Sequence, residues 1–152
     1  MQRRFSRRWS RRPLAALSAI VVALTAVTLP ACQKKSPEED LLKKVEPVGS
    51  WLASLEMTGR KWLANSVPTS FAKNSLSAAG KAFDKAAEET AKSEAGPEVR
   101  ARLGQLVSEA RAAGAGLRRG IEAGDRGAVA REVGRLAQLH RRFDAIEGGG
   151  GS

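Results

Sequence analysis

Apolar residues recur every three or four positions along most of the chain beyond residue 36, and this spacing restricts the possible folds more than any other feature. Such a period places the apolar side chains on one face of an α-helix. Four successive stretches carry it. Their positions are Leu41, Val45, Val48, Leu52, Leu55, Gly59 and Trp62; Ala72, Leu76, Ala79, Phe83, Ala86 and Thr90; Val99, Leu103, Leu106, Ala110, Ala113, Leu117 and Ile121; and Val129, Val133, Leu136, Leu139, Phe143 and Ile146. The pattern predicts an all-α domain, a small antiparallel bundle of four helices in up-down-up-down order over residues 37–147.

Turn and capping residues separate the four stretches. Ser36 precedes a proline and is followed by a glutamate three positions later, which is a capping box at the start of a helix. Pro47 interrupts the first stripe and predicts a kink there, because proline removes one helical hydrogen bond. Breaks are expected at residues 65–68, 95–97 and 124–125.

Small residues are common in the last two stretches, so their core is predicted to be thin. A glycine inside a helix costs roughly 0.5–1 kcal/mol relative to alanine. We expect close helix packing and modest stability, with an arrangement of two helical hairpins as the structural alternative. The six glycines concerned are Gly104, Gly114, Gly116, Gly120, Gly127 and Gly134.

The first 31 residues have the organisation of an export signal. Met1–Pro13 contains six arginines, and Leu14–Leu29 is an uninterrupted run without charge. As a helix those 16 residues would span about 24 Å, which is shorter than the ~30 Å hydrocarbon core of a bilayer. A cleaved signal peptide is therefore favoured over a permanent transmembrane anchor.

The tetrapeptide Leu29-Pro30-Ala31-Cys32 follows the apolar run and resembles the lipobox of bacterial lipoprotein precursors. The resemblance implies cleavage before Cys32, a thioether-linked diacylglycerol on its sulfur, and acylation of the new amino terminus by a fatty acid such as palmitate. The bilayer is then a partner through the acylated Cys32, with residues 32–36 as a short tether. Gln33, in place of aspartate, implies the periplasmic side of the outer membrane.

The arginines of the leader allow two export routes. Ser10-Arg11-Arg12-Pro13-Leu14-Ala15 resembles a twin-arginine motif, which implies export of an already folded domain. The general secretory route is the alternative. At the other end of the chain, residues 148–152 are glycine followed by serine and predict a flexible tail.

Charge argues against a nucleic-acid partner. The chain has a formal net charge of +10, but six of its 26 basic residues lie in the first 12 positions. The chain from Gln33 onward keeps 20 basic and 16 acidic residues, a net charge of +4. These charges alternate in sign along the predicted helices, which is typical of solvated helix faces.

Residues able to hold a metal or a cofactor, or to perform catalysis, are sparse after Cys32. His140 and Met57 are the single histidine and methionine of this region, and no metal or haem motif includes them. There is no Gly-x-Ser-x-Gly motif, and carboxylates such as Glu88 and Glu89 are adjacent, so their side chains diverge on a helix. We predict no metal, no cofactor and no enzymatic activity.

Trp51, Trp62 and Phe71 are concentrated around the first predicted turn. They either fill core volume that the alanines leave empty or form an exposed surface for a partner or ligand. The favoured functional hypothesis is a non-enzymatic interaction or structural module with an unidentified protein partner. The alternative is a bundle that binds a small molecule or cofactor between its helices, near Trp62, Phe71 and Phe83.

Overall fold

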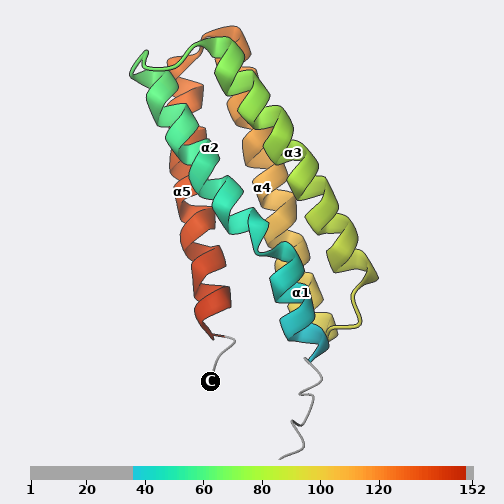
Figure 1. Ribbon diagram of the computed structural model, residues 1–152. Coiled ribbons are helices and arrows are strands. Elements are labelled where there is room, and N and C mark those ends of the chain that lie inside the picture. Colours follow the sequence, from blue (N-terminus) through green and yellow to red (C-terminus); the bar gives the residue numbers. More distant parts are fainter. Residues whose placement is uncertain (1–35, 150–152) are drawn as a thin grey trace, which may run out of the picture. The chain divides into compact units, whose positions relative to one another are not determined.

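Residues 36–149 are described by a computed structural model, and all of their regular secondary structure is helical (Figure 1). The predicted signal peptide, Cys32 and the rest of the tether before Ser36 lie outside the described residues. The helices are α1 (Pro37–Val45), α2 (Pro47–Leu63), α3 (Thr69–Lys92), α4 (Pro97–Ala123) and α5 (Arg126–Gly149).

Helices α2 to α5 form an antiparallel bundle in which each helix packs against the next along the chain and α5 returns to pack against α2. Helix α1 precedes α2 with a change of direction and packs mainly against α3. The prediction of a small all-α bundle is confirmed, with α1 and α2 as the two parts of the interrupted first helix.

The interruption at Pro47 is local. Proline has no N–H group, so the carbonyl four residues earlier loses its helical partner. On both sides of Pro47 the backbone remains bonded, because the Glu46 N–H donates to the Leu42 carbonyl at 2.9 Å and the Gly49 N–H donates to the Glu46 carbonyl at 3.2 Å. The axis changes direction without an intervening loop, as the sequence predicts.

Caps close several helix ends as expected. The Ser36 hydroxyl accepts from the Glu39 N–H at 3.2 Å, and the Glu39 carboxylate accepts from the Ser36 N–H at 3.4 Å, which completes the capping box. At the α4–α5 turn Gly124 has a left-handed φ of 69°, and Asp125 accepts from the Ala128 N–H at 2.9 Å. These contacts satisfy backbone groups that a helix terminus leaves without partners.

The predicted tail begins two residues too early. Helix α5 continues through Gly148 to Gly149. Glycine lowers helix stability by about 1 kcal/mol but does not remove the N–H group that bonds to the carbonyl four residues earlier, so a short glycine extension can remain helical. Residues 150–152 lie outside the described residues.

The four predicted stripes supply the core. The largest fully buried side chains include Phe83 and Phe143, one from each half of the domain, together with leucines from α1, α2, α4 and α5. Alanines fill much of the remaining interior. Val99, Ile146 and Trp62 lie at the ends of their stripes and are only partly buried.

Glycine permits the closest approach of α2 to α5. A Cβ atom built on Gly49 would lie 2.8 Å from Cδ1 of Phe143, and one built on Gly59 would overlap Cγ2 of Val133. Neither position has room for a side chain unless the helices separate. By contrast, a Cβ on Gly134 would meet nothing within 4 Å. The sequence-based expectation of close packing concerned other glycines, those of α4 and α5. Among them, Cβ atoms on Gly116 and Gly120 would meet Glu132 at 2.6 Å and Val129 at 3.0 Å, whereas one on Gly104 would make only ordinary contact.

These contacts predict opposite effects for two glycine-to-alanine substitutions. Gly59→Ala should lower the free energy of unfolding by about 1–3 kcal/mol, because overpacking forces the helices to shift. Gly134→Ala should raise it by about 0.5–1 kcal/mol, because the added methyl meets open space and alanine favours the helix. Urea unfolding followed by circular dichroism measures both. Equal stability of Gly59→Ala and the unaltered protein would contradict the packing described here.

Candidate functional site

Trp62 is held in place by polar contacts at the α2–α3 turn. Its indole N–H donates to the Thr69 hydroxyl at 3.1 Å, and the Arg126 guanidinium lies over its ring, 5.9 Å from the centroid. Arg126 also donates to the Leu63 carbonyl and to the Asn65 side chain, the latter at 3.3 Å. Arg126, at the start of α5, therefore binds the C-terminal end of α2 through these hydrogen bonds and through its contact with the Trp62 ring.

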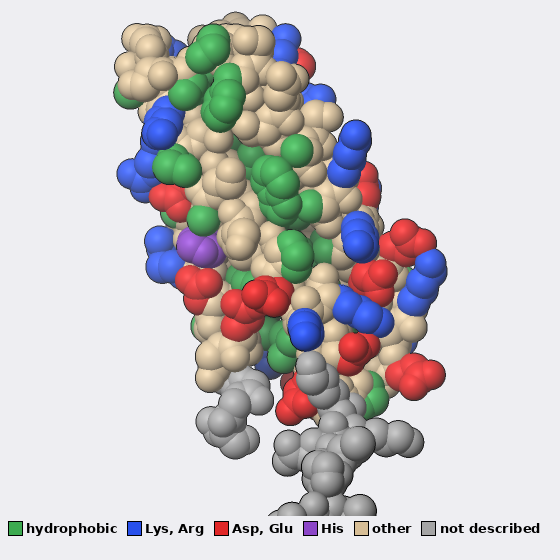
Figure 2. Space-filling model, viewed as in Figure 1, with side chains coloured by type: hydrophobic (Ala, Val, Ile, Leu, Met, Phe, Trp, Pro, Cys, Tyr) green, Lys and Arg blue, Asp and Glu red, His purple; other side chains and the backbone are tan. Residues whose placement is uncertain are grey.

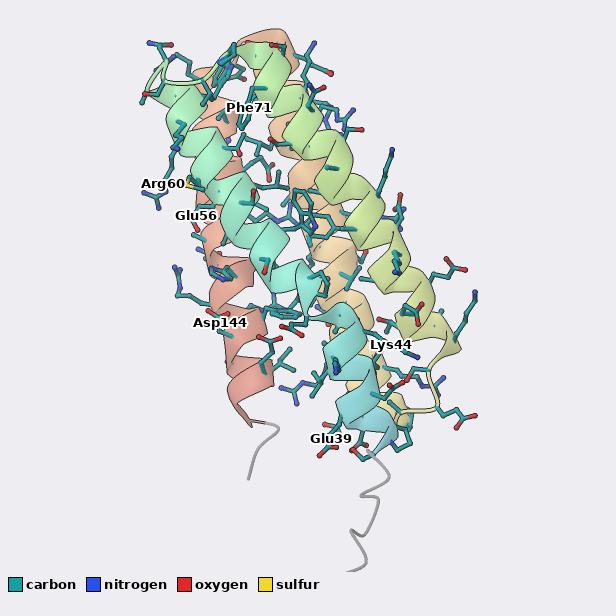
Figure 3. All side chains as sticks on the ribbon, in the orientation of Figure 1. Glu39, Lys44, Glu56, Arg60, Phe71 and Asp144 are labelled. Carbon is teal, nitrogen blue, oxygen red and sulfur yellow. The ribbon has the colours of Figure 1, made fainter. Side chains whose placement is uncertain are left out.

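The other two aromatic residues differ in exposure. Trp51 is partly buried and packs against the core. Phe71, in the first turn of α3, is 51% exposed and lies at the end of the bundle opposite Glu39 (Figure 3). Trp51 and Trp62 therefore fit the interpretation that these aromatic residues fill core volume. Phe71 fits the interpretation that they form an exposed surface. Figure 2 shows apolar side chains grouped over this end and along the seam between α2 and α3.

Phe83 lies away from this surface. It is 12 residues beyond Phe71, which on α3 corresponds to about 18 Å along the helix axis. The small-molecule hypothesis expected Phe83 to lie beside Trp62 and Phe71. The structure does not bring these residues together.

Phe83 instead lines a cavity of about 150 Å³ formed by α2, α3 and α4. Its inner wall is apolar, and its rim carries three charged side chains, of which Arg111 and Asp84 form an ion pair at 2.7 Å. The lining residues are Leu55, Leu76, Gly80, Phe83, Asp84, Arg111, Gly114, Ala115 and Arg118.

A second hollow, of about 310 Å³, lies between α1, α4 and α5. The helix axis changes direction at Pro47, so α1 does not continue along α5 as α2 does. The last turns of α5 are therefore not covered by a helix on that side. Apolar side chains line it beside charges of both signs. The lining residues are Ser36, Glu38, Glu39, Leu42, Val99, Arg102, Leu103, Ala145 and Ile146.

Sequence reasoning missed this second hollow. The kink at Pro47, together with the terminal stripe positions Val99 and Ile146, was the signal available. Beside the hollow, Arg142 of α5 contacts Glu109 of α4 at 2.5 Å. Hydrogen bonds from Arg142 and then from Gln105 lower the pKa of Glu109, so its carboxylate remains ionised in neutral solution.

Glu147, near the end of α5, has the opposite shift. The side chain of Glu147 is exposed, but limited desolvation raises its pKa, and the negative charges of Glu46 and Asp144 raise it further. Figure 3 places Asp144 on α5 at the level of the α1–α2 junction. Because the folded state favours protonated Glu147, ionisation of this carboxyl destabilises the fold as pH rises through its raised pKa.

Replacing Glu147 therefore predicts a pH-dependent gain. Glu147→Gln should melt at a higher temperature than the unaltered protein in neutral solution, and the difference should shrink as pH falls below the ordinary glutamate value of 4.5. Thermal melts at neutral and acidic pH measure it. The exposed Glu94, in the α3–α4 connection, supplies the control Glu94→Gln. A gain that is the same at both pH values would contradict the assignment.

Other polar groups do not converge on a catalytic or metal arrangement within residues 36–149. There, no group of three or more histidine, cysteine, aspartate or glutamate side chains is placed to hold a metal ion. His140 lies beside Asp144 one turn along α5, at 3.5 Å. Within the same residues, none of the helices is long and apolar enough to cross a membrane.

Comparison with known proteins gives no relative. No protein family, curated protein or solved structure matches the chain.

Proposed function

We propose that the chain is the precursor of a lipid-anchored, extracytoplasmic helical module that acts by binding rather than by catalysis. The observation that carries the proposal is the leader, in which an arginine-rich segment and a short apolar run end at Leu29-Pro30-Ala31-Cys32. Acyl chains on Cys32 supply the anchor, since two or more chains give stable membrane attachment. The outer membrane, on its periplasmic side, is the proposed location.

The short tether supports a position close to the bilayer. Ser36 caps α1, and only three residues separate it from Cys32 along the chain. The four residue-to-residue steps from Cys32 to Ser36 span at most about 14 Å when extended. Lys34 and Lys35, within this segment, would add attraction of about 1 kcal/mol each near anionic headgroups.

Substitution of Cys32 tests the anchor. In the producing bacterium, the unaltered protein should fractionate with membranes and require detergent for release. Cys32→Ser lacks the sulfur that carries the diacylglycerol, so its intact mass should show no added acyl groups. Gln33→Ser, at the neighbouring position, is the matched control and should remain lipid-attached. Release of the unaltered protein into aqueous buffer, with a free Cys32 thiol, would refute the anchor.

A protein partner is the favoured binding target, and Phe71 is the proposed centre of its contact surface. Aromatic side chains contribute a large share of binding energy at protein interfaces. Phe71 and Met57 are the two large apolar side chains that are more than half exposed among the described residues. Phe71 lies at the end of the bundle remote from Glu39 in the first turn of α1, and therefore away from the proposed anchor.

Phe71→Ser should weaken partner binding without unfolding the bundle. Cross-linking in intact cells, followed by affinity purification and quantitative mass spectrometry, should recover a reproducible partner with the unaltered protein and much less with Phe71→Ser. Met57→Ser, which removes a similarly exposed apolar side chain from α2, should recover it normally. Unchanged recovery with Phe71→Ser would exclude this surface.

Small-ligand binding is the second candidate function. The cavity lined by Phe83 favours it, because an apolar interior with a few polar groups at the mouth is the usual form of a ligand site.

A further inference from the structure

We propose that the cavity between α2, α3 and α4 binds a single aromatic ring that carries a carboxylate. The inference rests on the second candidate function, small-ligand binding, and adds the chemical class of the ligand. It does not depend on the lipid anchor.

The size and lining of the cavity fit one ring. Its volume is about 150 Å³, and an engineered protein cavity of about 150 Å³ lined by leucine, isoleucine and phenylalanine binds benzene. The inner wall here consists of Leu55, Leu76 and Phe83, each at most 3% exposed. A ring in this space would contact Phe83 as aromatic pairs do and would exclude water from the core side.

The rim of the cavity selects for negative charge. Arg111 and Asp84 neutralise one another through their ion pair at 2.7 Å. Arg118, one helical turn further along α4 than Gly114, has no ion-pair or hydrogen-bond partner among residues 36–149. The rim therefore keeps one uncompensated positive charge, and a guanidinium group is well shaped to bind a carboxylate through two parallel hydrogen bonds.

Two glycines leave the space open without being required by helix packing. A Cβ atom on Gly80 would meet nothing within 4 Å, and one on Gly114 would lie 3.6 Å from Leu55 Cδ1 and 3.8 Å from Phe83 Cε2, which is ordinary contact. This differs from Gly59, where a neighbouring helix excludes a side chain. Larger side chains at Gly80 or Gly114 would fill the cavity while leaving the helix interfaces in place.

The hollow between α1, α4 and α5 gives a weaker indication of ligand chemistry. The hollow beside α1 is larger, but its rim combines Arg102 with Glu38 and Glu39. It therefore has no excess of positive charge that would select an anion.

The test uses sodium benzoate as the probe and benzyl alcohol as an uncharged ring of similar size. The protein is residues 34–152, a compact unit that contains the whole described core. Titrations followed by ¹H–¹⁵N spectra should show benzoate-dependent shifts at Gly80, Gly114 and Ala115. Benzyl alcohol should shift the same residues with about tenfold lower affinity, because it lacks the charge-assisted hydrogen bonds.

Variants separate the ring contact from the charge contact. Arg118→Gln should lower benzoate affinity about tenfold and leave that of benzyl alcohol unchanged. Arg119→Gln, an exposed arginine next to it on α4, should change neither. Gly114→Val should abolish binding of both probes, with circular dichroism to verify its helical content. Gly80→Val is a second filling variant in case the first fails to fold.

The possible outcomes separate the preference for a carboxylate from small-ligand binding in the cavity, on which that preference rests. If both probes bind in the cavity with equal affinity and Arg118→Gln affects neither, small-ligand binding stands and the preference for a carboxylate is overturned. If neither probe shifts the cavity residues, or if shifts occur only elsewhere, both are overturned. Benzoate binding that depends on Arg118 and is lost in the filled variant supports both.

Discussion

The approach of α2 to α5 at Gly49 and Gly59 is the contact on which the rest of the bundle depends. Three of the six buried residues of α3 are alanines, and α1 covers only one end, so α3 contributes only Leu76 and Phe83 as large side chains to the core. Packing at this distance brings Phe143 and Val133 against the backbone of α2. Backbone-to-side-chain contact of this kind compensates for a core with little bulk, because dispersion energy accumulates over many close atom pairs.

Small side chains and the break at Pro47 account for two of the concave regions among the described residues. Gly80 and Gly114 leave a cavity where three helices meet, and the break at Pro47 leaves a hollow where α1 departs from α5. The first has an apolar interior and, at its rim, a guanidinium without an ion-pair partner among residues 36–149, and the second has mixed charge. The exposed apolar side chain of Phe71 lies at the end of the bundle away from Glu39. A module tethered near Cys32 would therefore present its proposed partner surface away from the membrane.

Local chemistry explains which features were predictable from the sequence. The capping box at Ser36, the break at Pro47 and the left-handed Gly124 each follow from a few adjacent residues, and the stripes identified the buried faces correctly. Features that depend on neighbouring helices were not predictable. Helical periodicity gives the face of Gly59 but not that Val133 lies opposite, and it cannot separate this glycine from Gly80, which borders a cavity. The grouping of Phe83 with Trp62 and Phe71 failed for the same reason.

We propose that acyl chains on Cys32 hold this bundle at a membrane, and the intact mass of the native protein tests that proposal. Protein extracted from bacterial membranes should have the mass of a chain that begins at Cys32, increased by a diacylglycerol group and by an additional fatty acyl group. A mass that corresponds to an unmodified chain, whether it begins at Cys32 or at any other residue, would contradict the claim.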